Sequence, residues 1–181
     1  MKEIKEGKAV INVPIEEKVS KKLDVFYNPN MELNRSISIA LLNSIDKKDM
    51  QIALPLAGSG VRGIRFLLEL DQDKIKNISL NDYDEKAVSL IKKNLEKNKV
   101  KANVFYKDAN LFLMESTGFD YIDIDPFGSP NFLLDSACKR ISREGILAVT
   151  ATDTGALAGT FKDAGIRKYF GKPLKNELMH E

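Results

Sequence analysis

Two aspartates and an aromatic ring gather where one apolar segment ends. Residues 119–130 read FDYIDIDPFGSP, so Asp125 closes a run that is typical of a buried strand, and Pro126, Phe127 and Gly128 form a tight corner after it. Proline stiffens the corner and removes a donor, so nearby carbonyl groups remain able to accept hydrogen bonds. An acid, carbonyl acceptors and a flat ring together suit a planar group that carries an amine. The alternative is a rigid turn whose Phe127 packs inward.

A glycine-rich loop lies earlier in the chain, between an apolar run and a helical pattern. Residues 56–63 read LAGSGVRG. Gly58 and Gly60 permit positive φ and a close approach of a ligand to the backbone, and the helix that follows offers N–H groups at its start. No Gly-Lys-Ser/Thr follows, so this is not a Walker A loop. The alternative is a packing turn without a ligand.

Acids follow the next two predicted strands. Asp82 lies 24 residues beyond Gly58, close to the spacing at which an acid holds a ribose diol in nucleotide-binding α/β domains. The alternative is a helix cap, although Asp84 is better suited to that role. Asp108 and Ala109 offer a carboxylate beside a backbone N–H, which matches the amino group and ring nitrogen of an adenine; an exposed turn acid is the alternative. Together these residues predict a nucleoside cofactor.

S-adenosylmethionine explains these positions better than a nicotinamide nucleotide does. Either cofactor would use the glycine loop and Asp82, but only methyl transfer to an amine gives a role to the corner that begins at Asp125. In this arrangement the sulfonium lies between the ends of two strands, with its methyl group directed at whatever Asp125 and Phe127 hold. Asp123, expected on the same strand face as Asp125, has no role in this scheme.

The elements that must position these residues alternate along the chain. The patterns predict strands over 8–15, 51–56, 77–80, 102–106, 121–124 and 146–150. They predict helices over 31–45, 64–70, 85–98, 132–142 and 161–170, with a loop over 151–160. The first helix is expected to bury one broad apolar face, made of Leu33, Ile37, Ile39, Ala40, Leu41 and Leu42. Strands separated by helices predict a doubly wound, mostly parallel α/β sheet of Rossmann-like type.

Composition favours one soluble, cytoplasmic domain. The chain has 181 residues, of which 43% are hydrophobic and 30% charged, and its net charge is +2. No apolar run approaches the roughly 20 residues of a membrane span, and the N-terminus lacks a signal-peptide pattern. Single Cys138 and His180 argue against a zinc site, so no metal is expected. Basic residues gather over 92–101, where a solvated helix face is the simplest explanation, and at a second cluster better placed for phosphates: Lys162, Arg167, Lys168, Lys172 and Lys175.

The chain resembles the tRNA (guanine-N2-)-dimethyltransferases of archaea and eukaryotes, which methylate the exocyclic amine of guanine 26. The resemblance covers almost the whole sequence. It is carried, in family order, by EGKAVINVP, VFYNPNMELNR, GSGVRGIRF, LNDYDEKA, DIDPFGSP, GILAVTATD and ELMHE. The pair DPFGSP and GILAVTATD is far more specific than any glycine loop.

This resemblance implies an S-adenosylmethionine-dependent methyltransferase that acts on tRNA, adding one and then a second methyl group. The cofactor-binding positions that it implies are Arg35, Arg62, Asp82, Asp108 and Ala109, in addition to Gly58 and Gly60 of the loop. It implies that Asp125 is the catalytic acid, and that Phe127 stacks on a guanine taken out of its helix. Phe26 matches a family position near the cofactor and the target base, while Pro126 and Gly128 shape the corner.

Two departures from the family pattern lead to further expectations. Leu54 stands where family members carry an acid before the glycine loop. Family proteins also continue past ELMHE with further strands and a C-terminal domain, so residues 1–181 are expected to be a truncated catalytic domain, with an extension over about 1–48 and a cofactor-binding core from about 49. An edge strand left uncovered could support self-association. The alternatives are an inactive homologue that binds RNA or a partner without turnover, and an amino-methyltransferase for another nucleic acid or a protein.

Overall fold

Five parallel strands organise the molecule. In the computed structural model, which describes residues 1–15 and 25–173, the strands stand in the order β5-β4-β3-β6-β7, and their pairings are parallel. Their bounds are Met50–Leu54 (β3), Ile75–Asp82 (β4), Asn103–Tyr106 (β5), Phe119–Ile124 (β6) and Ile141–Val149 (β7). The strand order reverses between β3 and β6, which places a ligand crevice beyond the carboxyl ends of these strands. The predicted doubly wound fold is confirmed.

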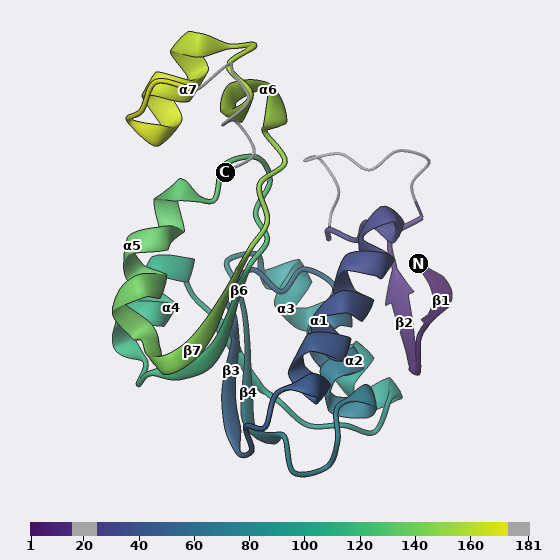
Figure 1. The fold of residues 1–181 in the computed structure, drawn as a ribbon. Coiled ribbons are helices and arrows are strands. Elements are labelled where there is room, and N and C mark those ends of the chain that lie inside the picture. The colour runs from purple at the N-terminus through teal and green to yellow at the C-terminus, as the bar shows by residue number, and fades with distance from the viewer. Residues whose placement is uncertain (16–24, 174–181) are drawn as a thin grey trace.

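Helices cover both faces of this sheet (Figure 1). One face carries α1 (Glu32–Ser44), α2 (Val61–Glu69) and α3 (Glu85–Lys97), and the other carries α4 (Ala109–Glu115) and α5 (Asn131–Arg140). Each face has its own apolar core. A sheet covered on both faces needs apolar side chains on both, and stretches such as IAL in β3 and GILAV in β7 supply them.

Neighbouring residues of a strand point into opposite cores. Ile52 and Leu54 of β3 belong to the core under α2 and α3, whereas Ala53 packs on the other side with α4 and α5. Tyr121 and Ile122 of β6 divide in the same way. Because strand side chains alternate with period two, each of these strands presents its last residues to both layers.

A hairpin outside the main sheet precedes these elements. Its antiparallel strands are β1 (Lys2–Glu6) and β2 (Ala9–Val13). The outer edge of β2 is closed by side-chain amides of α3, since the N–H of Val10 donates to Asn98 Oδ1 at 2.9 Å and that of Asn12 to Asn94 Oδ1 at 2.8 Å. These amides do for β2 what a further strand would do, and they fix the hairpin against α3.

Beyond β7 the chain leaves the sheet at its carboxyl end (Figure 1). It forms α6 (Thr154–Leu157) and α7 (Lys162–Tyr169), which stand above the strand ends. Phe161 and Phe170, on either side of α7, are 64% and 87% exposed. A short 3₁₀ helix, η1 (Pro29–Met31), leads into α1. No helix among the described residues combines the length and apolarity that a membrane span requires.

Several expectations about elements were wrong. The structure has β1 and α4, which the sequence patterns did not predict, and residues 154–157 of the expected loop form α6. Residues 141–142, expected in a helix, begin β7. The expected apolar face of α1 is correct for Ile39 and Leu42, which are buried, and wrong for Leu33 and Ile37, which are 70% and 58% exposed. Arg35 and Ser38 are buried in their place. Polar partners at the sheet edge, described next, account for the burial of these two polar side chains.

Candidate active site

The loop after β3 bends at two glycines. Gly58 and Gly60 have φ of +53° and +79°, the left-handed region that favours glycine. A Cβ on Gly58 would lie 2.8 Å from the carbonyl oxygen of Phe26, so the loop packs directly against the backbone ahead of α1. Gly60 immediately precedes the first turn of α2. The loop therefore ends at a helix N-terminus beside the reversal of strand order.

Asp82, at the end of β4, is bonded to this loop. Its Oδ2 accepts the N–H of Gly58 at 2.8 Å, and its Oδ1 accepts the N–H of Asp84 at 3.0 Å. Burial is the main reason that the pKa of Asp82 lies above its ordinary value. The capping role belongs to Asp84, whose side chain accepts the N–H of Lys86 at 2.8 Å. Asp82 is therefore not the helix cap that the alternative interpretation required.

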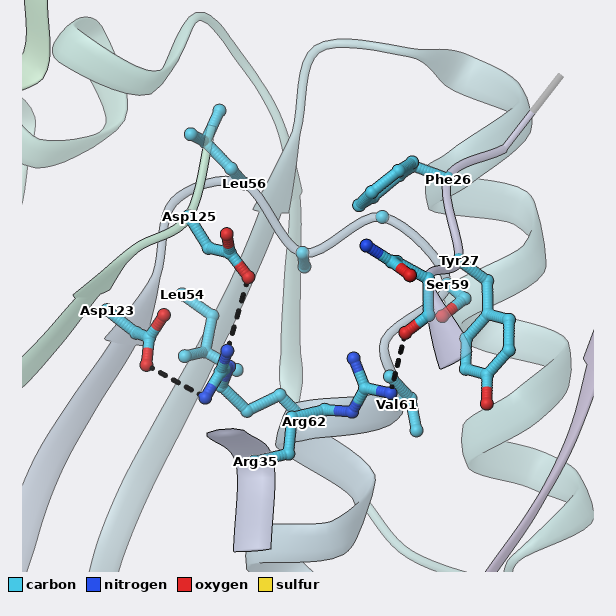
Figure 2. Close-up of a pocket in the computed structure, with 13 residues that line it drawn as sticks. Phe26, Tyr27, Arg35, Leu54, Leu56, Ser59, Val61, Arg62, Asp123 and Asp125 are labelled. Atoms are coloured by element: carbon cyan, nitrogen blue, oxygen red, sulfur yellow. Dashed lines mark hydrogen bonds and ion pairs between the residues drawn. The ribbon is translucent and has the colours of Figure 1, made fainter. Parts of the chain in front are cut away.

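Arg62 of α2 joins the two acids at the end of β6. Its Nη2 lies 3.2 Å from Oδ2 of Asp125, and its Nη1 lies 3.3 Å from Oδ2 of Asp123 (Figure 2). The hydroxyl of Tyr121 donates to the same Asp123 oxygen at 2.7 Å. Burial raises the pKa of Asp123, while the charge of Arg62 and the Tyr121 hydrogen bond act against this rise. Asp123 therefore takes part in fixing Arg62.

Polar residues of α1 hold the other side of Arg62. Nη2 donates to Asn34 Oδ1 at 2.7 Å, and Nη1 donates to Ser38 Oγ at 3.0 Å. A buried guanidinium needs such acceptors, because leaving its donors unpaired away from water is costly. These bonds explain why Asn34 and Ser38 of α1 face Arg62.

The corner after β6 is shaped by the remaining predicted residues. Pro126 is buried, but Phe127 is 42% exposed, and its ring meets the ring of Phe26. Gly128 has φ of +85°, and it exchanges two hydrogen bonds with Thr152, at 2.9 and 3.0 Å. Phe127 therefore does not pack into the core, as the alternative of an inward-facing ring required.

Two adjoining hollows open at these strand ends. The first lies among the glycine loop, Arg35, Arg62 and the two acids of β6 (Figure 2). The second lies between Asp82 and Phe127. The hollows share Phe26, Leu56, Gly58 and Asp125, so one wall serves both. Between them they bring together eight of the predicted site residues: Phe26, Arg35, Gly58, Arg62, Asp82, Asp125, Pro126 and Phe127.

Four predicted residues do not line either hollow. Gly60 and Gly128 shape the neighbouring backbone instead. Asp108 is exposed and caps α4, since its Oδ1 accepts the N–H groups of Asn110 and Leu111 at 2.9 and 3.1 Å. Ala109 is buried in the core below α4. Both follow β5 at the same sheet edge as Asp82, and their contact with an adenine stays a prediction.

Sequence reasoning left several residues of this region without a role. Asn34 and Ser38 are polar residues four apart on α1, beside Arg35, and this spacing was an available signal. The sequence offers no role for Asp123, because its partner Arg62 belongs to another element. Oε2 of Glu6, in the N-terminal hairpin, lies 2.6 Å from Nη2 of Arg35. No local sequence pattern predicts such a contact.

The structure is similar to that of Trm1 from Pyrococcus horikoshii in complex with S-adenosyl-L-methionine. The TM-score is 0.85 at 38% sequence identity, and the match covers 99% of this chain and 50% of that one. The parallel sheet, the glycine loop and the acid after β4 agree with this likeness. The protein therefore has the Rossmann-like fold of the methyltransferases.

Comparison with protein families identifies the family within that class. The chain belongs to the N2,N2-dimethylguanosine tRNA methyltransferases, whose family model matches residues 7–181. The tRNA (guanine(26)-N(2))-dimethyltransferase of Methanobrevibacter smithii is 44% identical, over 100% of this chain and 47% of the relative. The tRNA (guanine(26)-N(2)/guanine(27)-N(2))-dimethyltransferase of Aquifex aeolicus is 40% identical, over 100% and 48%. The chain thus spans about half the length of these relatives, and the resemblance read from its motifs is confirmed.

Proposed function

We propose that this chain is the catalytic part of an S-adenosylmethionine-dependent methyltransferase acting on the exocyclic N2 amine of guanine 26 in tRNA. The observation that carries the proposal is the placement of Asp125, held by Arg62, beside the exposed ring of Phe127 and the hollow that contains Asp82. An acid and an exposed ring at one strand end suit a flat base with an amine. The family membership and the names of the relatives support the same substrate.

The residues present fit the proposed cofactor. Counted as ionised, Asp123 and Asp125 outweigh Arg62, and Glu6 balances Arg35. This negative balance suits a ligand whose sulfonium, ammonium and carboxylate groups sum to one positive charge. The cofactor, when bound, supplies an activated methyl group. Arg35 and Arg62 would face its carboxylate, Asp82 its ribose hydroxyls, and Asp108 and Ala109 its adenine.

Asp125 would act on the amine. The lone pair of a guanine amine is delocalised into the ring, so the nitrogen attacks only when an acceptor draws on its N–H bonds. One oxygen of Asp125 is bonded to Arg62, and the other points away from it (Figure 2). This second oxygen can accept the amine N–H and take up the proton, while Arg62 keeps the carboxylate in place.

Phe127 would hold the base. A guanine must leave its stack to reach a pocket at the edge of a sheet. The exposed face of Phe127 can replace that stacking, which is worth roughly 1–3 kcal/mol per base. Orientation of the amine toward the methyl donor then supplies much of the rate, because little covalent chemistry is left to the protein. For the second methylation, the product of the first must turn within the same corner.

The test is a methylation assay with the chain as it is. Transfer RNA that carries guanine at position 26 is incubated with the protein and S-adenosylmethionine. The tRNA is then digested, and its nucleosides are separated and identified by mass spectrometry. We expect N2-methyl- and N2,N2-dimethylguanosine, which should be absent when position 26 is changed to adenine. Product at guanine 27, in another RNA or in a protein would redefine the substrate.

A second candidate function is binding of RNA or a partner protein without turnover, and Leu54 favours it. Leu54 is buried in the wall of the first hollow, so this wall is apolar where family members carry an acid. Calorimetric titration with S-adenosylmethionine separates the two functions. Absence of S-adenosylmethionine binding would support the second function, whereas binding followed by product formation would support methyl transfer.

Self-association through β7 stays a prediction that we include in the proposal. Among the described residues β7 pairs only with β6, so it forms one edge of the sheet. Unpaired N–H and C=O groups on such an edge can bond a second chain. Light scattering over a range of concentrations should show a dimer; a constant monomer mass would exclude this part of the proposal.

A further inference from the structure

A buried carboxylate lies outside the strand ends, in the N-terminal hairpin. Glu6 closes β1 and is 1% exposed. It accepts hydrogen bonds from the hydroxyl of Tyr27 at 2.9 Å, from Nε and Nη2 of Arg35 at 2.7 and 2.6 Å, and from Nη1 of Arg65 at 3.1 Å. Burial alone would raise the pKa of Glu6, but the bonds and charge of Arg35, with Tyr27 and Arg65, lower it. Glu6 is therefore a charged anchor.

Two of these partners control the backbone ahead of α1. Arg35 also donates from Nη2 to the carbonyl of Asn28 at 3.0 Å, and its guanidinium lies 5.4 Å from the centre of the Tyr27 ring. Residues 26–28, which we call the strap, are thus attached to Glu6 at two points. One attachment is the Tyr27 hydroxyl, and the other is the Arg35 bridge to Asn28.

The strap forms a wall of the candidate active site. All three of its residues line the first hollow. The carbonyl of Phe26 accepts the N–H of Ser59 at 3.2 Å, and it is the atom that leaves no space for a Cβ on Gly58. The ring of Phe26 touches Phe127. The strap therefore contacts both the glycine loop and the corner that would hold the base.

We propose that Glu6 is a positioning residue for the cofactor pocket, holding the strap over the glycine loop through Tyr27 and Arg35. This inference rests on the proposed function of the pocket. Arg65 does not share the role, because Glu69 binds it independently at 2.8 and 2.9 Å. Among the described residues Arg35 forms an ion pair with no carboxylate other than Glu6. Loss of the Glu6 charge therefore acts on the strap more than on Arg65.

The test compares Glu6→Gln with Glu3→Gln. Both changes remove one negative charge from β1, but Glu3 has an exposed side chain that pairs with Lys97, and Lys97 lies outside the strap. The first measurement is the affinity for S-adenosylmethionine by calorimetry. The second, which needs no ligand, is hydrogen exchange of the Ser59 amide by NMR, with the Ile122 amide of β6 as the reference for global opening.

We expect Glu6→Gln to weaken cofactor binding by roughly tenfold, about the size of one lost hydrogen bond to a charged group, because the strap is then held less firmly over the glycine loop. Exchange at Ser59 should become faster relative to Ile122, and Glu3→Gln should leave both measurements unchanged. Wild-type affinity together with wild-type exchange at Ser59 in Glu6→Gln would overturn the inference. Equal acceleration at Ser59 and Ile122 would also overturn it, since Glu6 would then only stabilise the fold.

Two other results are possible: the wild-type chain does not bind the cofactor, or Glu6→Gln does not fold. If the wild-type chain does not bind S-adenosylmethionine, the proposed function fails, and exchange at Ser59 alone decides whether Glu6 holds the strap. If Glu6→Gln does not fold, Tyr27→Phe replaces it, because this change deletes one hydroxyl and leaves the charges paired. Tyr27→Phe should accelerate exchange at Ser59, and an unchanged rate there would overturn the inference.

Discussion

The ring of Phe26 meets the ring of Phe127 edge to face, with centroids 4.2 Å apart and planes at 70°. Such a pair contributes about 0.5–1.5 kcal/mol beyond the burial of its area. The contact joins the strap to the corner after β6, two segments that are far apart in the sequence. It holds the ring of Phe127 in one orientation while leaving part of it exposed, which a stacking platform requires.

Phe127→Ala should reduce methyl transfer to tRNA while leaving the cofactor affinity within about twofold. The loss of base stacking, about 1–3 kcal/mol, predicts a decrease in kcat/KM of roughly 5- to 150-fold. Initial rates with tRNA and calorimetry with S-adenosylmethionine measure the two effects. Leu41→Ala removes an equally exposed apolar side chain, 42% in both cases, and should change neither. A large loss of cofactor affinity in Phe127→Ala would contradict the assignment to the base.

Asp125→Asn should strongly reduce the rate of methyl transfer and have a smaller effect on the binding of tRNA and cofactor. The amide retains an oxygen that can accept from Arg62, but it cannot take a proton from the amine. General-base catalysis is typically worth 10²- to 10⁴-fold, so kcat should fall by about that factor. Single-turnover rates with saturating tRNA and cofactor measure it. A kcat close to that of the wild-type chain would show that another group receives the proton.

Asp82→Asn should weaken S-adenosylmethionine binding by roughly 10- to 100-fold, since hydrogen bonds to a charged acceptor contribute about 1.5–3 kcal/mol. Burial raises the pKa of Asp82, so as the pH falls its carboxylate is protonated earlier than an ordinary aspartate. The cofactor affinity of the wild-type chain should therefore decline on acidification, and that of Asp82→Asn should decline less. Calorimetry across the acidic range measures both curves, and parallel curves would exclude Asp82 as the titrating group.

The basic residues of the α7 region should contact tRNA phosphates. Lys162, Arg167 and Lys172 are exposed beyond the carboxyl end of the sheet. Replacing all three with Gln should weaken tRNA binding. It should also make the negative slope of log K against log salt shallower by up to about three, one for each phosphate that is no longer neutralised. Filter binding at several salt concentrations measures this slope. The same three changes at Lys92, Lys93 and Lys97 of α3 are the control, and an equal effect there would indicate only general attraction.

The Tyr27 hydroxyl should lose its proton only at a higher pH than an ordinary tyrosine does. Burial and the hydrogen bond to Glu6 raise its pKa to about 12. In Glu6→Gln the pKa should move down toward the ordinary 10.0, because the negative acceptor that opposes the phenolate is gone. NMR of ring-labelled tyrosine follows the titration, and Tyr27→Phe identifies the signal. A pKa that is the same in both proteins would mean that the bond to Glu6 does not form in solution.

The sequence was sufficient to locate the strands of the main sheet because several of them contain a short apolar stretch next to a turn signal. The stretches IAL of β3 and GILAV of β7 are examples. It was insufficient for β1, whose KEIKE pattern is mostly charged and becomes a strand only against β2. The sequence patterns also did not predict the short helix α4, whose N-terminus is capped by the side chain of Asp108.

For the site, residues at strand ends were predictable because parallel strands bring their carboxyl ends to one edge. Asp82, Asp125 and Phe127 follow from that rule. The pairing of Arg62 with Asp123, and of Arg35 with Glu6, depends on how α1, α2 and the hairpin pack. Pairing across elements leaves no periodic trace in a single sequence. The same packing decides which face of α1 is buried: Ile39 and Leu42 enter the core beside the polar Arg35 and Ser38, and Leu33 and Ile37 stay exposed.

The acid and the ring of the corner are held from different places. Asp125 is tethered to α2 through Arg62, whereas Phe127 rests on Phe26 and is followed by a glycine hinge bonded to Thr152. The ring can therefore be exchanged for another side chain without moving the carboxylate. In the proposed function, the side chain that contacts the base can therefore change while the proposed proton acceptor stays in place, so that substrate preference and chemistry are separately adjustable.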